Sequence, residues 1–235
     1  MARTSTPRAR TPAGAQAFTR KLLTWWARAA RDLPWRQTRD PYRVLVSEFM
    51  LQQTQVSRVL EYYPRFMARF PTIAALARAR PKAVMEEWDG LGYYARARNL
   101  HQLAREVTRR HDGTLPDDPE ALRTLPGVGR YTAGAVACFA YEKPVAAVDT
   151  NVRRVLERAF APDDVWSLAE TMMPTRGTTA WKFNQAMMEL GALVCTARKP
   201  NCPECPVRRD CLTGRSAVRI RNRRSVHPGE SPAKR

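Results

Sequence analysis

The stretch LPGVGRYT, residues 125–132, decides the fold of this chain. The run 118–125 that leads into it predicts a short helix, its two glycines predict a tight turn, and 130–141 predicts a second helix. Glycine lets the backbone approach a phosphate closely, and N–H groups at the start of the second helix point outward to bind it. The same turn could simply join two helices, but the whole string in a basic chain favours a phosphate clamp. The expected contacts are Gly127, Gly129, Arg130 and Thr132.

Apolar side chains recur at helical spacing along most of the chain, and no segment shows the sustained alternation of a strand. The predicted fold class is therefore all-α. Pro64 is expected to break the helix predicted over 56–69. The helices are predicted at 17–31, 43–55, 56–69, 72–87, 95–111, 118–125, 130–141, 150–160, 164–173 and 181–194.

The chain has 235 residues, 44% of them hydrophobic, and a formal net charge of +18. This length allows one large domain, or two small ones, around a sizeable core. The excess of Lys and Arg persists when the terminal stretches 1–16 and 212–235 are set aside. An arginine-rich genome could produce such a composition, but the charge favours a polyanionic partner, above all nucleic acid.

No run approaches the ~18–20 apolar residues of a membrane span, and residues 1–16 lack the apolar core of a secretory signal. We therefore expect a cytoplasmic protein without a membrane partner.

Four of the five cysteines, Cys195, Cys202, Cys205 and Cys211, follow a C-x6-C-x2-C-x5-C pattern. In a chain without a secretory signal, such a cluster predicts a metal site rather than disulfides. Zinc sites usually combine two short pairs of ligands, and only one short pair is present here. Four thiolates around a [4Fe–4S] cluster therefore fit better than zinc.

Two carboxyl groups are candidates for catalysis. Glu48 is flanked by apolar residues in SEFMLQQTQ (47–55), so burial of the apolar helix face would raise its pKa and make it a general acid. The alternative is an ordinary surface glutamate. Asp149 follows an apolar run and precedes a helix, whose dipole keeps a carboxylate ionised. It could be a simple cap, but an ionised carboxylate there also suits a developing sugar cation.

Together these strings resemble the helix-hairpin-helix DNA glycosylases that include endonuclease III, and most closely the MutY-type adenine DNA glycosylases. The resemblance extends over roughly residues 17–211. It rests on LPWR (33–36), SEFMLQQTQV (47–56), WDGLGYYARARNLH (88–101), LPGVGRYTAG (125–134), VDTNVRRVL (148–156) and MELGALVCTARKPNCPECPVRRDC (188–211).

The resemblance implies a two-lobed, all-α fold with a [4Fe–4S] cluster loop. One lobe would combine 17–42 with 146–211 and carry the cluster. The other, a six-helix barrel over 43–145, would carry the hairpin. Residues 1–16 and 212–235 would be disordered basic tails.

The resemblance also implies roles for single residues in excising a base flipped out of the duplex. Glu48 would protonate the adenine ring, Asp149 would stabilise the oxocarbenium-like sugar, and Tyr131 would lie near Asp149 and assist. Gln53 and Tyr93 would contact the duplex beside the extruded base, together with the hairpin residues. The base pocket would contain Arg36, Trp35, Glu189 and Asn151, and the cluster ligands would be Cys195, Cys202, Cys205 and Cys211.

The implied activity is that of a monofunctional base-excision-repair glycosylase, which hydrolyses the N-glycosidic bond of adenine mispaired with G or 8-oxoguanine. Tyr131 stands where strand-cleaving relatives have a Lys that forms a Schiff base. Tyr at this position also occurs in glycosylases that act on T:G or U:G, so a mismatch thymine or uracil glycosylase is the alternative. A non-catalytic DNA-binding protein is the third possibility.

Only 24 residues follow Cys211, too few for the 8-oxoguanine-reading domain that usually completes MutY-type enzymes. This leaves the opposite base open. The expected partner is duplex DNA with a mismatched or damaged base pair, bound by a monomer at the nucleoid of a bacterial-type cell.

Overall fold

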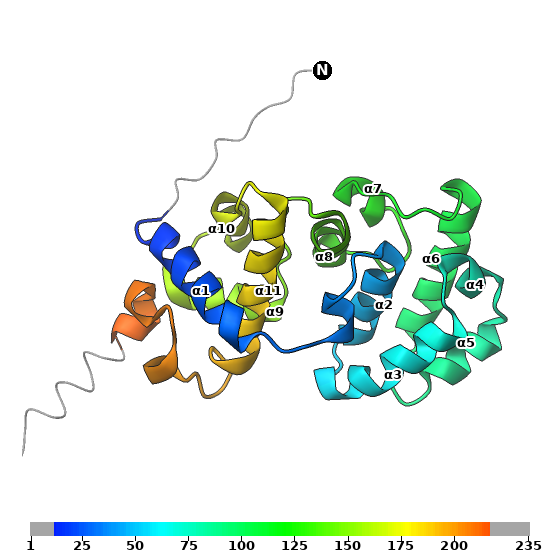
Figure 1. The fold of residues 1–235 in the computed structure, drawn as a ribbon, viewed down its shortest axis with the longest axis horizontal. Coiled ribbons are helices and arrows are strands. Elements are labelled where there is room, and N and C mark those ends of the chain that lie inside the picture. Colours follow the sequence, from blue (N-terminus) through cyan, green and yellow to red (C-terminus); the bar gives the residue numbers. More distant parts are fainter. Residues whose placement is uncertain (1–11, 217–235) are drawn as a thin grey trace, which may run out of the picture. The chain divides into compact units, whose positions relative to one another are not determined.

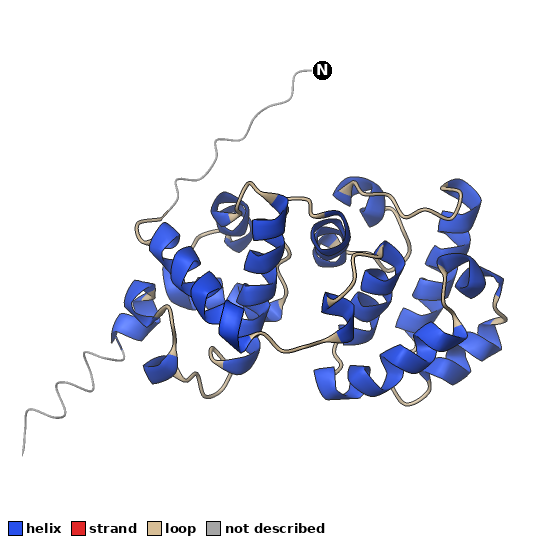
Figure 2. Ribbon diagram, in the orientation of Figure 1, coloured by secondary structure: helices blue, strands red, loops and turns tan. Residues whose placement is uncertain are grey.

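The structure is a computed structural model, and it describes residues 12–216 of the chain. Every regular element in this range is a helix (Figure 2), which confirms the predicted all-α class. The described residues form two compact units. The first unit contains 12–30, 148–173 and 182–216, and the second contains 31–147 and 174–181.

The second unit is built on two apolar helices, α2 (Pro41–Leu51) and α8 (Arg130–Tyr141), which pack against each other (Figure 1). Close packing of α8 requires Gly134, because a Cβ there would lie 2.3 Å from the carbonyl oxygen of Ala146. The other elements of this unit are a 3-10 turn (Pro34–Arg36), α3 (Val56–Arg69), α4 (Ile73–Arg78), α5 (Pro81–Trp88), α6 (Ala95–Arg110) and α7 (Pro119–Arg123).

Pro64 does not break α3, contrary to the prediction. The helix continues to Arg69 and buries one apolar face. Pro64 cannot donate to the carbonyl of Leu60. Both residues are exposed, so water can satisfy this carbonyl. Burial of the apolar face then outweighs the lost hydrogen bond. The buried residues on this face are Val59, Tyr62, Tyr63, Phe66 and Met67.

The single helix predicted over 72–87 is two helices, α4 and α5. Ala79 and Arg80 have extended backbone angles between them, and Pro81 is the first residue of α5. Proline disfavours the helical conformation in the residue before it, so the break falls at Arg80.

The first unit contains α1 (Ala15–Ala29), α9 (Thr150–Phe160), α10 (Val165–Met172) and most of α11 (Gly177–Leu193), whose first residues belong to the second unit. Phe18 of α1 packs against Phe160 of α9, with ring centroids 5.2 Å apart. Lys21 of α1 forms a 2.6 Å ion pair with Asp210, which lies in the cysteine-bearing segment. Two 3-10 turns, Cys202–Glu204 and Arg208–Asp210, shape that segment.

The two units differ in part from the predicted lobes. Residues 31–42, 146–147 and 174–181 lie in the second unit rather than with the cysteines. The predicted disorder is wrong for 12–16 and 212–216, because α1 begins at Ala15 and 212–216 form a helical turn. Residues 1–11 and 217–235, the rest of the predicted tails, lie outside the described residues. No helix between 12 and 216 is both long and apolar enough to cross a bilayer.

Candidate active site and iron–sulfur loop

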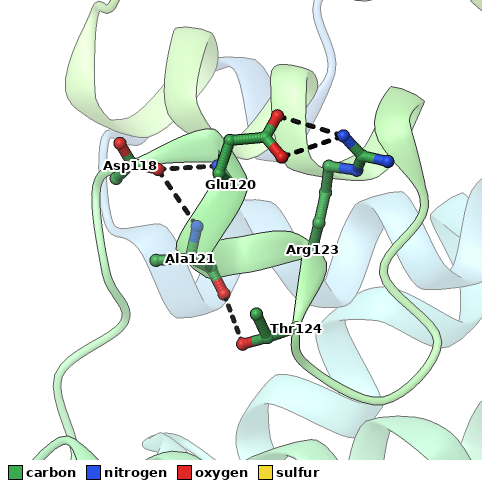
Figure 3. Close-up of polar contacts among 5 residues, drawn as sticks. All are labelled: Asp118, Glu120, Ala121, Arg123 and Thr124. Atoms are coloured by element: carbon green, nitrogen blue, oxygen red, sulfur yellow. Dashed lines mark hydrogen bonds and ion pairs between the residues drawn. The ribbon is translucent and has the colours of Figure 1, made fainter. Parts of the chain in front are cut away.

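A capped helix positions the first arm of the glycine hairpin. Oδ1 of Asp118 accepts hydrogen bonds from the backbone N–H groups of Glu120 (2.7 Å) and Ala121 (3.0 Å), which caps α7 (Figure 3). Arg123 forms a 2.9 Å ion pair with Glu120. Thr124 Oγ1 donates to the carbonyl of Ala121 at 2.7 Å. These bonds fix α7 at both ends, directly before the turn.

The two glycines of the turn have different parts. Gly127 has a φ of 76°, in the left-handed region, and a Cβ there would lie 2.8 Å from Cβ of Asn99. Gly129 precedes α8, which has no side-chain cap, and a Cβ at Gly129 would meet nothing within 4 Å. The start of α8 is therefore accessible, as a phosphate clamp requires. Arg130 is exposed there, but the side chain of Thr132 is buried (3% exposed), so only its backbone could contact a phosphate.

Glu48 is buried, not a surface glutamate. Its side chain lies on α2 and is 4% exposed. Tyr131, in the first turn of α8, donates a hydrogen bond from its hydroxyl to Oε2 of Glu48 at 2.7 Å. Because α2 packs against α8, the carboxyl group of Glu48 lies beside the second helix of the hairpin. The prediction that Tyr131 lies near Asp149 stays untested, because Asp149 belongs to the other unit.

Gln53 and Tyr93 lie on two exposed turns of the second unit. Both have positive φ angles, 55° and 47°, which residues other than glycine rarely adopt. The side chain of Tyr93 is 60% exposed. Backbone strain of this kind concentrates at functional sites. Both residues line one groove, together with Gln52, Tyr94, Arg96 and Arg98.

Arg96, which the sequence analysis does not single out, holds these two turns together. Its side chain is 7% exposed, and burial lowers the pKa of the guanidinium. This single cation satisfies the carbonyls at the end of α2, which have no helical partners. It donates to the carbonyls of Phe49 (3.0 Å), Met50 (2.8 Å), Gln52, Leu91 (3.1 Å) and Gly92 (3.0 Å).

Replacing Arg96 with Met is expected to lower the free energy of unfolding by about 3 kcal/mol. Met keeps the apolar bulk but leaves several buried carbonyls unsatisfied, each at a cost of about 1–3 kcal/mol that is only partly additive. Urea denaturation measures the change. The matched control is Arg65→Met, because Arg65 is exposed on α3 and its ion-pair contact with Glu87 is long, 3.9 Å. A loss no larger than that of the control would contradict the role of Arg96.

Asp149 caps α9 and is partly buried. Its Oδ1 accepts from the N–H of Val152 (2.7 Å), and its Oδ2 accepts from Nδ2 of Asn151 (3.0 Å). Burial raises the pKa of Asp149, while these hydrogen bonds and the charge of Arg154 oppose the rise. The carboxyl group is thus poorly solvated, which a simple cap does not require.

Two arginines on α9 connect this carboxyl group to the cysteine segment. Arg154 donates to Oδ1 of Asn151 (2.7 Å) and to the carbonyls of Gly191 (2.8 Å) and Cys195 (2.8 Å). Arg158, one turn further on, lies 3.4 Å from Sγ of Cys195. Neither arginine is among the functional residues predicted from the sequence. Asp149, Asn151, Arg154 and Cys195 form a continuous chain of hydrogen bonds within the first unit.

The resemblance implies base excision, and replacing Arg154 with Gln is expected to impair that reaction without loss of the fold. The charge of Arg154 lowers the pKa of Asp149, so its removal raises that pKa further. If Asp149 must be ionised, the acid limb of the pH–rate profile then moves to higher pH, whereas a merely structural defect would lower the rate equally at every pH. Arg153→Gln, which removes an exposed partner of Glu157, is the control. An acid limb at the wild-type pH in Arg154→Gln would contradict a role of Arg154 in setting the pKa of Asp149.

The cysteine segment has the donor set of an iron–sulfur cluster. None of the four cysteines forms a disulfide. Burial raises the pKa of Cys205 to about 11, and the other three thiols are close enough to add to the rise. Gly214 N–H donates to Sγ of Cys211 at 3.3 Å, and hydrogen bonds to sulfur tune such clusters. Between 12 and 216, no three His, Cys, Asp or Glu side chains are arranged around one metal ion. In a [4Fe–4S] cluster each thiolate binds its own iron, so the cysteines need not converge on a point.

The predicted base-pocket residues belong to both units. Trp35 is buried in the second unit, and its ring packs at 73° to the ring of Tyr63, with ring centroids 5.5 Å apart. Arg36 donates from Nη1 to the carbonyl of Arg31 at 3.1 Å. Glu189, on α11 in the first unit, is completely buried, and Asn151 supports Asp149 there.

The glycine hairpin, the buried glutamate beside it and the four-cysteine segment define a helix-hairpin-helix protein of the DNA-repair type. Residues 46–174 match the HhH-GPD superfamily base excision DNA repair protein, and residues 195–211 match the iron-sulfur binding domain of endonuclease III. The chain belongs to the HhH-GPD superfamily of base excision DNA repair proteins, and its cofactor is a [4Fe–4S] cluster.

Several known proteins are similar to this chain. The adenine DNA glycosylase of Mycobacterium tuberculosis is 50% identical over 196 residues, which are 79% of this chain and 64% of that protein. That of Rattus norvegicus is 45% identical over 215 residues, 83% of this chain and 41% of its own length. The chain thus spans less than two thirds of these relatives. A solved thermostable thymine-DNA glycosylase is 33% identical with a TM-score of 0.80, and the match covers 86% of this chain and 97% of that one.

Proposed function

We propose that this chain is a monofunctional DNA glycosylase that removes adenine mispaired with G or 8-oxoguanine from duplex DNA. The observation that carries the proposal is the buried carboxyl group of Glu48, hydrogen-bonded by Tyr131 at the start of the hairpin's second helix. A general acid needs a carboxyl group shielded from water next to the element that holds the substrate. The similarity to adenine DNA glycosylases supports adenine as the target base.

The reaction is hydrolysis of the bond between C1′ and the base. Glu48 donates its proton to a ring nitrogen of adenine as this bond breaks and its electron pair leaves with the base. Ionised Asp149 stabilises the positive charge on the sugar. Water adds to C1′ and loses a proton, which gives free adenine and an abasic site. Tyr131 has no amine to form a Schiff base, so the strand stays intact.

DNA binding is assigned to three groups of residues. The hairpin N–H groups hold a phosphate, and Gln53 and Tyr93 fill the space that the flipped base leaves. The residues assigned to binding the extruded adenine are Trp35, Arg36, Asn151 and Glu189.

The four cysteines are assigned as ligands of the cluster, one thiolate for each iron. The cluster is assigned a structural role, in which it orders a loop rich in basic residues. The protein is proposed to act as a monomer on nucleoid DNA in the cytoplasm of a bacterial-type cell, because its substrate is there.

One observation favours a second candidate, a mismatch thymine or uracil glycosylase. A solved thymine-DNA glycosylase has the same fold as this chain, with a TM-score of 0.80 at 33% sequence identity. Tyr131 is compatible with either target.

Single-turnover excision on a panel of duplexes tests the target base. The panel contains A opposite 8-oxoguanine, A opposite G, A opposite C, T opposite G and U opposite G. We expect base release at A opposite 8-oxoguanine and A opposite G. Release at T:G or U:G alone would move the chain to the second candidate, and release from no duplex would contradict both.

A further inference from the structure

A groove between α4 and α6, in the second unit, is lined by arginines that the proposed chemistry does not use. Arg78 of α4 and Arg98, Arg105 and Arg109 of α6 all contribute to its walls. All four side chains are exposed. The three on α6 are spaced seven and four residues apart, so they share one face of the helix over about 16 Å.

These arginines have no acidic partner within residues 12–216. Other arginines of the same unit are paired: Arg123 with Glu120 at 2.9 Å, and Arg110 with Glu106 at 2.6 Å. Glu106 is the acidic residue that lines the groove, and Arg110 already engages it. A row of unpaired like charges is self-repelling, and an anionic ligand relieves that repulsion.

His101 adds a polar atom to the same groove. Its side chain lines the groove and is only 7% exposed, and Nε2 has no hydrogen-bond partner. Burial and the charge of Arg105 lower the pKa of the imidazole, while hydrogen bonds to the backbone of Ala79 and Ala77 oppose this fall. The arginines are therefore the cationic groups of the groove, and His101 is a neutral part of its wall.

The groove shares one lining arginine with each of two other grooves. Arg98 also lines the groove that contains Gln53 and Tyr93. Arg78 also lines a groove with Arg69, Arg80 and Lys82. These shared arginines make the three grooves neighbours on the second unit, and together we call them the basic track. Several cations in a row suit a repeating phosphate backbone better than a single small anion.

We propose that this track binds the phosphate backbone of duplex DNA outside the lesion site. The inference extends the proposed function, since it takes the DNA at Gln53 and Tyr93 as its starting point. The contacts are to phosphates, so they are independent of sequence and sensitive to salt. They would add affinity for undamaged DNA and for long substrates without taking part in the chemistry.

The test is a variant with both Arg105→Gln and Arg109→Gln in the full-length, cluster-loaded protein. Gln has nearly the helix propensity of Arg, so α6 is retained. Affinity for a long undamaged duplex is measured as a function of salt. We expect the slope of log K against log [salt] to fall in magnitude by about 2, since each lost phosphate contact contributes about 0.9. Single-turnover excision at saturating enzyme should equal that of the wild type.

The matched control is a variant with both Arg65→Gln and Lys143→Gln. It also removes two positive charges, but Arg65 is paired with Glu87 and Lys143 with Asp117. It should keep the wild-type slope. A wild-type slope in the groove variant, or an equal fall in both variants, would overturn the proposal. Absence of excision by the wild type would contradict the proposed function, but undamaged DNA would still test the track.

Discussion

Glu48→Gln is expected to lower the single-turnover rate of adenine release by about 10³-fold, within the range of about 10²–10⁴ that general acids contribute. The amide keeps the size of the side chain, and its oxygen can still accept the hydrogen bond from Tyr131. It has no acidic proton for the leaving base. The rate is measured at saturating enzyme on a duplex with A opposite 8-oxoguanine, together with the Kd for the same duplex, which should not change.

Glu61→Gln is the matched control. Glu61 is exposed on α3 and forms an ion pair with Arg58, so the same substitution there should leave the rate at the wild-type value. Turnover by Glu48→Gln at that rate would remove Glu48 from the mechanism. A rate loss accompanied by lost DNA binding would make Glu48 a structural residue.

Asp149→Asn is expected to reduce the excision rate by about 10²–10³-fold, the usual effect of losing one group that stabilises transition-state charge. Asn caps a helix as well as Asp does, so α9 should keep its start. Asp149 must be ionised to stabilise the sugar, and burial raises its pKa. As the pH is lowered, wild-type activity should therefore be lost at a higher pH than for a carboxyl group with an ordinary pKa. The pH–rate profile of the wild type and the rate of the variant measure these two effects.

The same substitution should leave the melting temperature unchanged or raise it near neutral pH. A carboxyl group whose pKa is raised in the folded state destabilises that state when ionised. This penalty is present above the folded pKa and disappears as the pH falls below the ordinary value of 3.8. Asp164→Asn is the control, because Asp164 caps α10 in the same manner but is exposed. A large loss of stability in Asp149→Asn alone would show that the carboxylate serves the fold rather than catalysis.

The sequence predicts the helical class and the placement of most helices because the apolar periodicity is strong. It also locates Glu48 on a helix with an apolar face, and the structure confirms that this residue is buried. The prediction that Pro64 breaks the helix is wrong. Burial of the apolar face of α3 outweighs the backbone hydrogen bond that the proline cannot form. Whether the carbonyl of Leu60 can reach water depends on which face of α3 is exposed, and the proline alone does not reveal that.

The largest omissions are Arg96 and Arg154. Each donates hydrogen bonds to backbone carbonyls of other segments of the chain. Every residue has a backbone carbonyl, so the sequence does not indicate which carbonyls an arginine will contact. A signal was nevertheless present, since both arginines lie inside the motifs that carry the resemblance. Tyr131 and Glu48 are 83 residues apart, and the resemblance assigned both to one site. Their hydrogen bond could not be predicted, because it depends on how α2 packs against α8.

Product analysis on a single duplex tests the central claim most directly. A duplex with A opposite 8-oxoguanine is incubated with the protein, and free adenine and strand breaks are measured before and after alkali, with and without borohydride. We predict that adenine is released in equal amount to the alkali-labile sites, with intact strands before alkali and no trapped covalent complex. No adenine release, or strand cleavage and borohydride trapping without alkali, would contradict a monofunctional glycosylase that uses Glu48 and Asp149.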